Sequence, residues 1–197
     1  MEKILTFHCL RCVKCCNPER FGAEILSIPI YEVDEVDKLR NLARQQNLKI
    51  RLEPDLMYFD ELNNRLIIVT YALQIDTGGC PFHKSECTIY EERPLTCRAY
   101  PLSVFRTKDT SSIMIKPECS FVQQNNTKLK NLDFYELSEV FSEEFPYARQ
   151  IQIKGNAITN QIEQLELEGK VKIPVKLPVK LTEEIEKMKK IRLDEIK

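Results

Sequence analysis

Four of the eight cysteines in this chain lie close together near its beginning. They follow the pattern C-x2-C-x2-C-C, in which each C-x2-C pair closes a small loop with two thiolates facing one centre. Such pairs bind zinc and iron–sulfur clusters alike, and the C-x2-C-x2-C spacing is typical of bacterial ferredoxins, where the thiolates hold a cubane cluster. The four residues are Cys9, Cys12, Cys15 and Cys16.

A second group of cysteines lies further along the chain. It consists of Cys80, Cys87 and Cys97, and Cys119 follows after a predicted pair of strands. Cys80 precedes Pro81, which is the local form of the last ligand in a ferredoxin run. Eight thiolates are enough for two tetrathiolate sites or for one site with additional thiols, and the sequence leaves both alternatives open.

Thiolates that lie close together need positive charge and N–H donors to offset their mutual repulsion. Arg93 and Arg98 flank Cys97 in a turn bounded by prolines, so we predict that both arginines bind the cofactor. Arg11 and Lys14 lie within the first group and are further sources of positive charge.

Histidines, tyrosines and apolar residues also lie beside the cysteines. Because enough cysteines are present, we interpret His8 and His83 as neighbours of the ligands and not as ligands themselves. Tyr90 and Tyr100 are expected to pack over the metal and limit access of solvent. The apolar residues expected to surround the site are Phe7, Phe82, Ile89 and Leu95.

The composition excludes several classes of protein. The net charge of −1 provides no overall basic field for nucleic acid or an anionic membrane, and no apolar run approaches the roughly 20 residues of a membrane helix. The N-terminus does not resemble a signal peptide, so we expect a cytoplasmic location. In a reducing compartment, clustered cysteines indicate metal binding or redox chemistry in preference to disulfides, which remain an alternative for hyperthermophiles.

Periodicity and turn residues predict an α+β fold, with a small antiparallel sheet, packed helices and cysteine-bearing loops around a metal or iron–sulfur site. Expected elements in the first part are a helix over residues 31–46, a hairpin over 56–73 that turns at Asn63 and Asn64, and a strand pair over 100–106 and 111–116.

The last part of the chain is predicted to be mainly helical. We expect residues 1–125 to form the cysteine-cluster domain and residues 126–197 to form a C-terminal helical extension packed on it. Expected elements there are a helix over 132–144 that stops near Pro146, a helix over 156–168, an extended segment over 170–181 and a last helix capped by Thr182.

Two long motifs resemble the CxxCxxCC family, also called the YkgJ-type cysteine-cluster proteins or the zinc- or iron-chelating domain. The family pattern is C-x2-C-x2-C-C, then C-x-F, then C-x-I-Y-x-x-R-P-x-x-C-R-x-[F/Y]-P. This chain has FHCLRCVKCC and later CPFHKSECTIYEERPLTCRAYP, and Cys119 corresponds to a late cysteine that is usual in the family. The resemblance covers residues 7 to about 119 and implies metal chelation through these cysteines.

Three hypotheses about function follow. The first is a cytosolic protein that binds an iron–sulfur cluster of the 4Fe-4S type through its thiolates, with a redox or transfer role and a protein or redox partner not specified by the sequence. The second is a zinc-stabilised module for protein interaction. The third is a protein-lysine N-methylase-like enzyme, which the resemblance implies because the flagellin lysine-N-methylases are a related branch, although no residue here matches a methyl-donor site.

Overall fold

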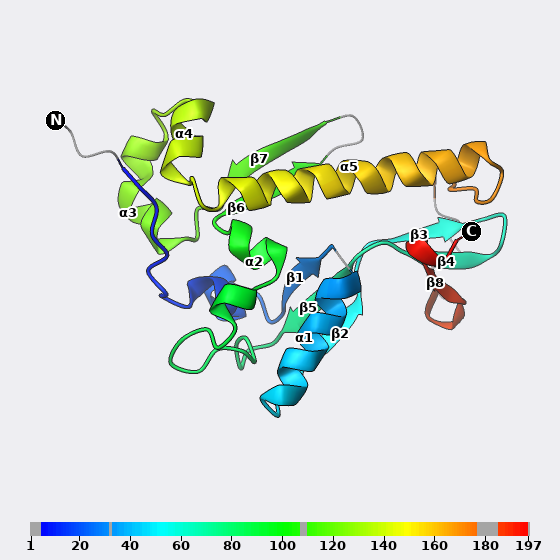
Figure 1. The fold of residues 1–197 in the computed structure, drawn as a ribbon, viewed down its shortest axis with the longest axis horizontal. Helices are drawn as coiled ribbons and strands as arrows, with labels where there is room; N and C mark the ends of the chain where they lie inside the picture. The colour runs from blue at the N-terminus through cyan, green and yellow to red at the C-terminus, as the bar shows by residue number, and fades with distance from the viewer. Residues whose placement is uncertain (1–4, 32, 107–109, 177–184, 197) are drawn as a thin grey trace.

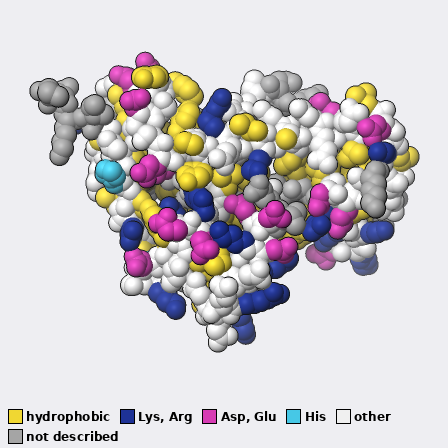
Figure 2. Space-filling view, viewed as in Figure 1, with side chains coloured by type: hydrophobic (Ala, Val, Ile, Leu, Met, Phe, Trp, Pro, Cys, Tyr) yellow, Lys and Arg dark blue, Asp and Glu magenta, His cyan; other side chains and the backbone are white. Residues whose placement is uncertain are grey.

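A computed structural model describes residues 5–31, 33–106, 110–176 and 185–196 of the chain. The fold is α+β, as the sequence predicts, but the strands are divided among three small sheets (Figure 1). On the face shown in Figure 2, Lys and Arg side chains are interspersed with Asp and Glu, in keeping with the near-zero net charge. Within the described residues, no helix is both long and apolar enough to cross a membrane.

The first sheet is antiparallel and has β5 (Tyr71–Ile75) at its centre. The strands β1 (Leu26–Ile30) and β2 (Arg51–Pro54) pair with its two edges. Sequence periodicity did not predict β1, which contains Pro29; an edge strand tolerates this proline because one side of the strand needs no backbone donor. The end of β5 leads directly towards Cys80, so this sheet positions the second group of cysteines.

Helix α1 (Val33–Gln45) confirms the helix predicted over residues 31–46. The apolar residues that recur at helical spacing are buried against the first sheet, and they include Val36, Leu39 and Ala43. Asp34 and Glu35 lie in the first turn, where negative charge is favourable to the helix dipole.

The second sheet contains the predicted hairpin. Strands β3 (Met57–Asp60) and β4 (Arg65–Ile68) are antiparallel and turn through Asn64, whose φ of 47° lies in the left-handed region that asparagine tolerates. A short strand near the C-terminus, β8 (Lys190–Arg192), adds to β4 in parallel. The sequence did not predict β8, because three residues carry too little periodicity.

A buried carboxylate fixes the hairpin to the segment that follows the longest helix. Asp60 is fully buried, and its Oδ2 accepts hydrogen bonds from Asn63 Nδ2 at 2.7 Å and Arg65 Nε at 2.9 Å. Its Oδ1 accepts from the backbone N–H of Lys172 at 3.1 Å. Two of these donors belong to the hairpin and the third to the segment after α5, so this carboxylate connects two distant parts of the chain.

The third sheet is the predicted strand pair, β6 (Leu102–Arg106) and β7 (Ser111–Ile115). The long helix α5 (Phe145–Leu167) runs beside this hairpin and along the length of the molecule (Figure 1). Its Gln152 side chain donates to the backbone oxygen of Ser111 at 2.9 Å. The hairpin is thereby held against the helix.

The helices of the last part differ from the prediction. Helix α4 (Phe134–Val140) is shorter than the predicted 132–144, and residues 156–168 belong to α5, which begins at Phe145. Pro146 therefore lies in the first turn of a helix and does not stop one. The N–H groups of a first turn have no acceptor within the helix, so a proline, which lacks an N–H, loses no hydrogen bond there.

The C-terminal expectations are only partly covered by the structure. Residues 170–176 of the predicted extended segment have no regular secondary structure, while residues 177–181 and Thr182 lie outside the described residues. The predicted last helix is wrong for residues 185–196. These form two short 3-10 turns, Ile185–Lys187 and Leu193–Glu195, on either side of β8.

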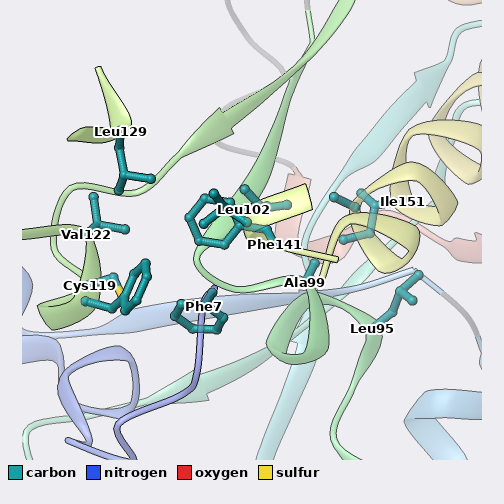
Figure 3. Close-up of a cluster of buried hydrophobic side chains, with 12 residues drawn as sticks. Phe7, Leu95, Ala99, Leu102, Cys119, Val122, Leu129, Phe141 and Ile151 are labelled. Carbon is teal, nitrogen blue, oxygen red and sulfur yellow. The ribbon is translucent and has the colours of Figure 1, made fainter. Parts of the chain in front are cut away.

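The largest apolar cluster joins the N-terminal segment to four helices (Figure 3). The ring of Phe7 lies 5.0 Å from that of Phe121 and 5.4 Å from that of Phe141, measured between centroids. Two helices not predicted from the sequence, α2 (Leu95–Ala99) and α3 (Ser120–Leu129), contribute to this cluster. The predicted division of the chain near residue 125 stays a prediction.

Candidate metal centre

All eight cysteines line one cavity of about 130 Å³. They come from three separate parts of the chain: the N-terminal segment, the stretch between β5 and β6, and the residue before α3. None of them is in a disulfide. A water molecule needs only about 10–15 Å³ of such space, so the cavity has room for a group of several atoms.

The N-terminal segment winds tightly around its cysteines. Arg11 and Val13 have φ values of 47° and 64°, a left-handed conformation that L-residues other than glycine rarely adopt. The N–H of Cys16 donates to the carbonyl oxygen of Val13 at 2.8 Å, which closes the short 3-10 turn Lys14–Cys16. These bends alternate with the cysteines and turn their thiols toward the same cavity.

A backbone hydrogen bond joins the first two groups of cysteines. The N–H of Cys80 donates to the carbonyl oxygen of Cys16 at 2.9 Å. Gly79 has a φ of 82°, which a glycine adopts without strain, and it lies directly against that carbonyl. The turn of two glycines predicted before Cys80 thus brings the second group onto the first.

Apolar anchors shape the loop that contains Cys80 and Cys87. Phe82 and Ile89 are buried in the cluster under the first sheet, and the backbone of Thr88 donates to the oxygen of Phe82 at 2.8 Å. The loop is therefore held at both ends while its two thiols face the cavity. Cys97 follows in α2, whose opposite side packs on α5.

Cys119 is the eighth cysteine that lines the cavity. It belongs to the large apolar cluster, where it is buried beside Val122 and the aromatic rings (Figure 3). The next residue, Ser120, has its Oγ 3.2 Å from the Sγ of Cys12. Sequence reasoning did not identify Ser120, because a serine after a cysteine carries no recognisable signal. Its hydroxyl connects the last cysteine segment to the first.

The thiolate charge of Cys15 acts on most of the other thiols of the cavity. In addition to their burial, this charge raises the pKa of Cys97, Cys87 and Cys119, which come from the two later parts of the chain. Cys15 therefore lies within electrostatic reach of cysteines from all three parts.

Burial and mutual repulsion oppose ionisation of several thiols. Burial raises the pKa of Cys97, Cys87 and Cys119, and neighbouring thiolates raise it further. The thiol of Cys16 lies 3.8 Å from that of Cys15 and forms hydrogen bonds with the thiols of Cys15 and Cys80. These hydrogen bonds raise the pKa of Cys16 and lower the pKa of Cys15 and of Cys80. A cation in the cavity would offset this repulsion and let the thiols ionise together.

The donor set therefore suits a thiolate-bound metal group. Among the described residues, however, no three Cys, His, Asp or Glu side chains converge on a position for a single ion. All eight thiols nevertheless line the same cavity.

Arg93 is the predicted cofactor-binding arginine that lines the cavity. Its guanidinium carbon lies 3.7 Å from the centroid of the Tyr90 ring, and its Nε donates to the Tyr90 carbonyl at 2.8 Å. The guanidinium carbon of Arg11 lies 4.7 Å from the same centroid. The charge of Arg93 favours the ionised form of Cys15 and Cys97.

Arg98 lies outside the cavity lining. Its Nε donates to the carbonyl oxygen of Arg93 at 2.7 Å, and its Nη2 donates to that of Glu91 at 2.8 Å. The guanidinium lies over the ring of Tyr147 in α5. Arg98 therefore holds the backbone of the turn that presents Arg93, and its predicted contact with a cofactor stays a prediction.

The other predicted neighbours of the site are placed as follows. His83 lines the cavity, whereas His8 is exposed and does not. Both predicted tyrosines line it, as do the apolar residues expected around it with the exception of Leu95, which is buried in the large cluster. The residues in contact with the cavity are Tyr90, Tyr100, Phe7, Phe82 and Ile89.

Comparison with protein families decides the identity of this region. The model of the family CxxCxxCC, described as "Putative zinc- or iron-chelating domain", matches residues 8–128. The chain belongs to the CxxCxxCC family. The matched range includes all eight cysteines and ends inside α3, so the family assignment and the cavity concern the same part of the chain. Comparison of this CxxCxxCC protein with curated proteins and with solved structures gave no match.

Proposed function

We propose that this protein is an iron–sulfur protein that holds a 4Fe-4S cluster in the cysteine cavity and has a redox or transfer role. The observation that carries the proposal is the gathering of eight thiols from three segments around one space larger than a single ion requires. When bound, such a cluster supplies one-electron chemistry at a potential tuned by its surroundings. The proposed ligands come from Cys9, Cys12, Cys15, Cys16, Cys80, Cys87, Cys97 and Cys119.

The surroundings of the cavity support this role. Phe7, Phe82 and Ile89 are buried and exclude water from the inner thiols, which matters because solvent exposure changes the potential of a cluster. Cys9 and Cys12 are exposed, so the cavity opens where the N-terminal segment passes over it. A redox partner protein would approach at this side, and a reducing compartment such as the cytoplasm would keep these thiols free.

A zinc-stabilised interaction module is the second candidate, and one distance favours it. Two sulfur ligands at about 2.3 Å from a tetrahedral zinc ion lie about 3.8 Å apart. The Sγ atoms of Cys15 and Cys16 are separated by 3.8 Å, which matches the spacing of two ligands of one zinc ion. A zinc ion bound at this pair would stabilise the fold and supply no redox chemistry.

Anaerobic purification followed by analysis of iron, acid-labile sulfide and zinc separates the two candidates. The proposal predicts a brown protein with iron and sulfide in equal amounts, about four of each per cluster, and visible absorbance that bleaches on reduction. A colourless protein with stoichiometric zinc, and no cluster after anaerobic reconstitution, would instead support the zinc-stabilised module.

A further inference from the structure

The hydroxyl of Tyr100 is a buried polar group without a hydrogen-bond partner among the described residues. Tyr100 lines the cysteine cavity, while its ring packs against the large apolar cluster. Buried hydroxyls are nearly always hydrogen-bonded, because leaving one unpaired forfeits the bonds it would make with water. The unpaired Oη therefore indicates a partner that belongs in the cavity.

Tyr100 lines the same cavity as all eight cysteines. A phenol is protonated at physiological pH, so its hydroxyl is an O–H donor. Ser120, whose hydroxyl lies 3.2 Å from the Sγ of Cys12, shows that a hydroxyl already pairs with a thiol at this cavity.

The hydroxyl oxygen of Tyr100 is itself buried, although the residue lines the cavity. It therefore has neither solvent nor a described side chain to bond. We propose that Tyr100 donates a hydrogen bond through Oη to the thiolate-bound metal group in the cavity, an inference that rests on the proposed metal binding.

This donor has two opposite effects on stability. In the metal-free protein the hydroxyl is buried and unpaired, so Tyr100→Phe should raise the melting temperature or leave it unchanged. In the metal-bound protein the same change removes a bond to the metal group, so it should lower the gain in melting temperature that the metal provides. A tyrosine with a purely structural role would change both states in the same direction.

Anaerobic titration of the full chain with Co²⁺ tests the inference. A hydrogen bond to a thiolate stabilises the sulfur lone pairs, so its loss should move the sulfur-to-cobalt charge-transfer band of Tyr100→Phe to longer wavelength. We expect Co²⁺ to bind about threefold to tenfold more weakly, from the typical net strength of one hydrogen bond. Tyr135→Phe is the matched control, because Tyr135 is 71% exposed and lies outside the cavity.

The possible results separate this inference from the proposed function. If the wild-type protein binds Co²⁺ with a thiolate charge-transfer band and Tyr100→Phe has the same band and affinity, the inference is wrong and metal binding stands. If the wild-type protein shows no such band and takes up no cluster on anaerobic reconstitution, the proposed metal binding fails and the inference fails with it. A shifted band and weaker binding in Tyr100→Phe alone, with Tyr135→Phe unchanged, supports the inference.

Discussion

The backbone N–H of Cys80 donates a 2.9 Å hydrogen bond to the carbonyl oxygen of Cys16, and this bond joins the two main groups of cysteines. The bond uses main-chain atoms and no thiol, so it leaves both thiols facing the cavity. A metal bound by thiols of the two groups would therefore stabilise the same chain arrangement as this bond.

Loss of one ligand should lower metal content and stability together. We expect Cys97→Ala and Cys12→Ala each to weaken metal binding by more than about tenfold, since the binding free energy of a metal is also folding free energy. The measurement is metal content together with thermal unfolding, with and without a chelator. For the exposed Cys12, the loss of stability should appear only in the metal-bound state.

Replacement of His83 should have a different result. His83 lines the cavity, but eight cysteines line it as well, so we expect His83→Ala to leave the metal content unchanged within error. Metal analysis of the purified variant checks this directly. Loss of metal in His83→Ala, combined with retention in Cys12→Ala, would show that the assignment of ligands is wrong.

The carboxylate of Asp60 should be important for stability and unimportant for metal binding. Asp60→Ala leaves the largely buried Arg65 without its partner, so we expect a loss of about 3–5 kcal/mol in urea unfolding. Glu53→Ala is the control, because Glu53 pairs with Arg51 on the surface and such pairs contribute about 0–1 kcal/mol. Metal content per folded chain should remain the same in both variants; a reduced content in Asp60→Ala would contradict this.

Glu144 should make stability fall as the pH rises. Glu144 is the residue before α5 and is partly buried. This burial, together with the charge of the nearby Glu143, raises the pKa of Glu144 to about 7 from an unfolded value near 4.5. The folded state therefore binds the proton of this carboxyl more tightly than the unfolded state does. The contribution of Glu144 to the free energy of unfolding is fully present below about pH 4.5 and is lost as the pH rises through about 7. We expect Glu144→Gln to be more stable than wild type at pH 8 by about 1 kcal/mol, after allowing for partial exposure to solvent.

Urea unfolding of wild type and Glu144→Gln at pH 5 and pH 8 measures this effect. The difference between the two proteins should grow with pH. An equal difference at both values would show that the carboxyl does not titrate in this range. Glu139→Gln is a suitable control, because Glu139 is exposed on α4 and is not among the groups that shift the pKa of Glu144.

The sequence was sufficient to predict that the site is built from separate groups of cysteines. The spacing of Cys9 to Cys16 indicated a metal ligand set, and the two glycines before Cys80 indicated a bend that would present the second group. These patterns were sufficient to predict the two cysteine groups because each motif lies within a short stretch of the sequence. Helix α1 and both predicted hairpins were found for the same reason, since their periodicity lies within a few residues.

Features that depend on tertiary contacts could not be predicted. The strand β1 contains a proline and forms only because β5 is available to pair with it. Helix α3 follows Cys119 without a clear pattern, and its Phe121 is buried by contact with Phe7. The contact of Cys12 with Ser120 likewise depends on how distant segments pack, which no local motif encodes.

We propose that thiols from all three segments hold one polynuclear iron–sulfur group. X-ray absorption spectroscopy of the anaerobically purified protein, at the iron and zinc edges, tests this most directly. We expect iron with sulfur as its only directly bonded neighbour, together with iron–iron scattering. A single metal ion without metal–metal scattering, or a first shell containing nitrogen or oxygen, would contradict it.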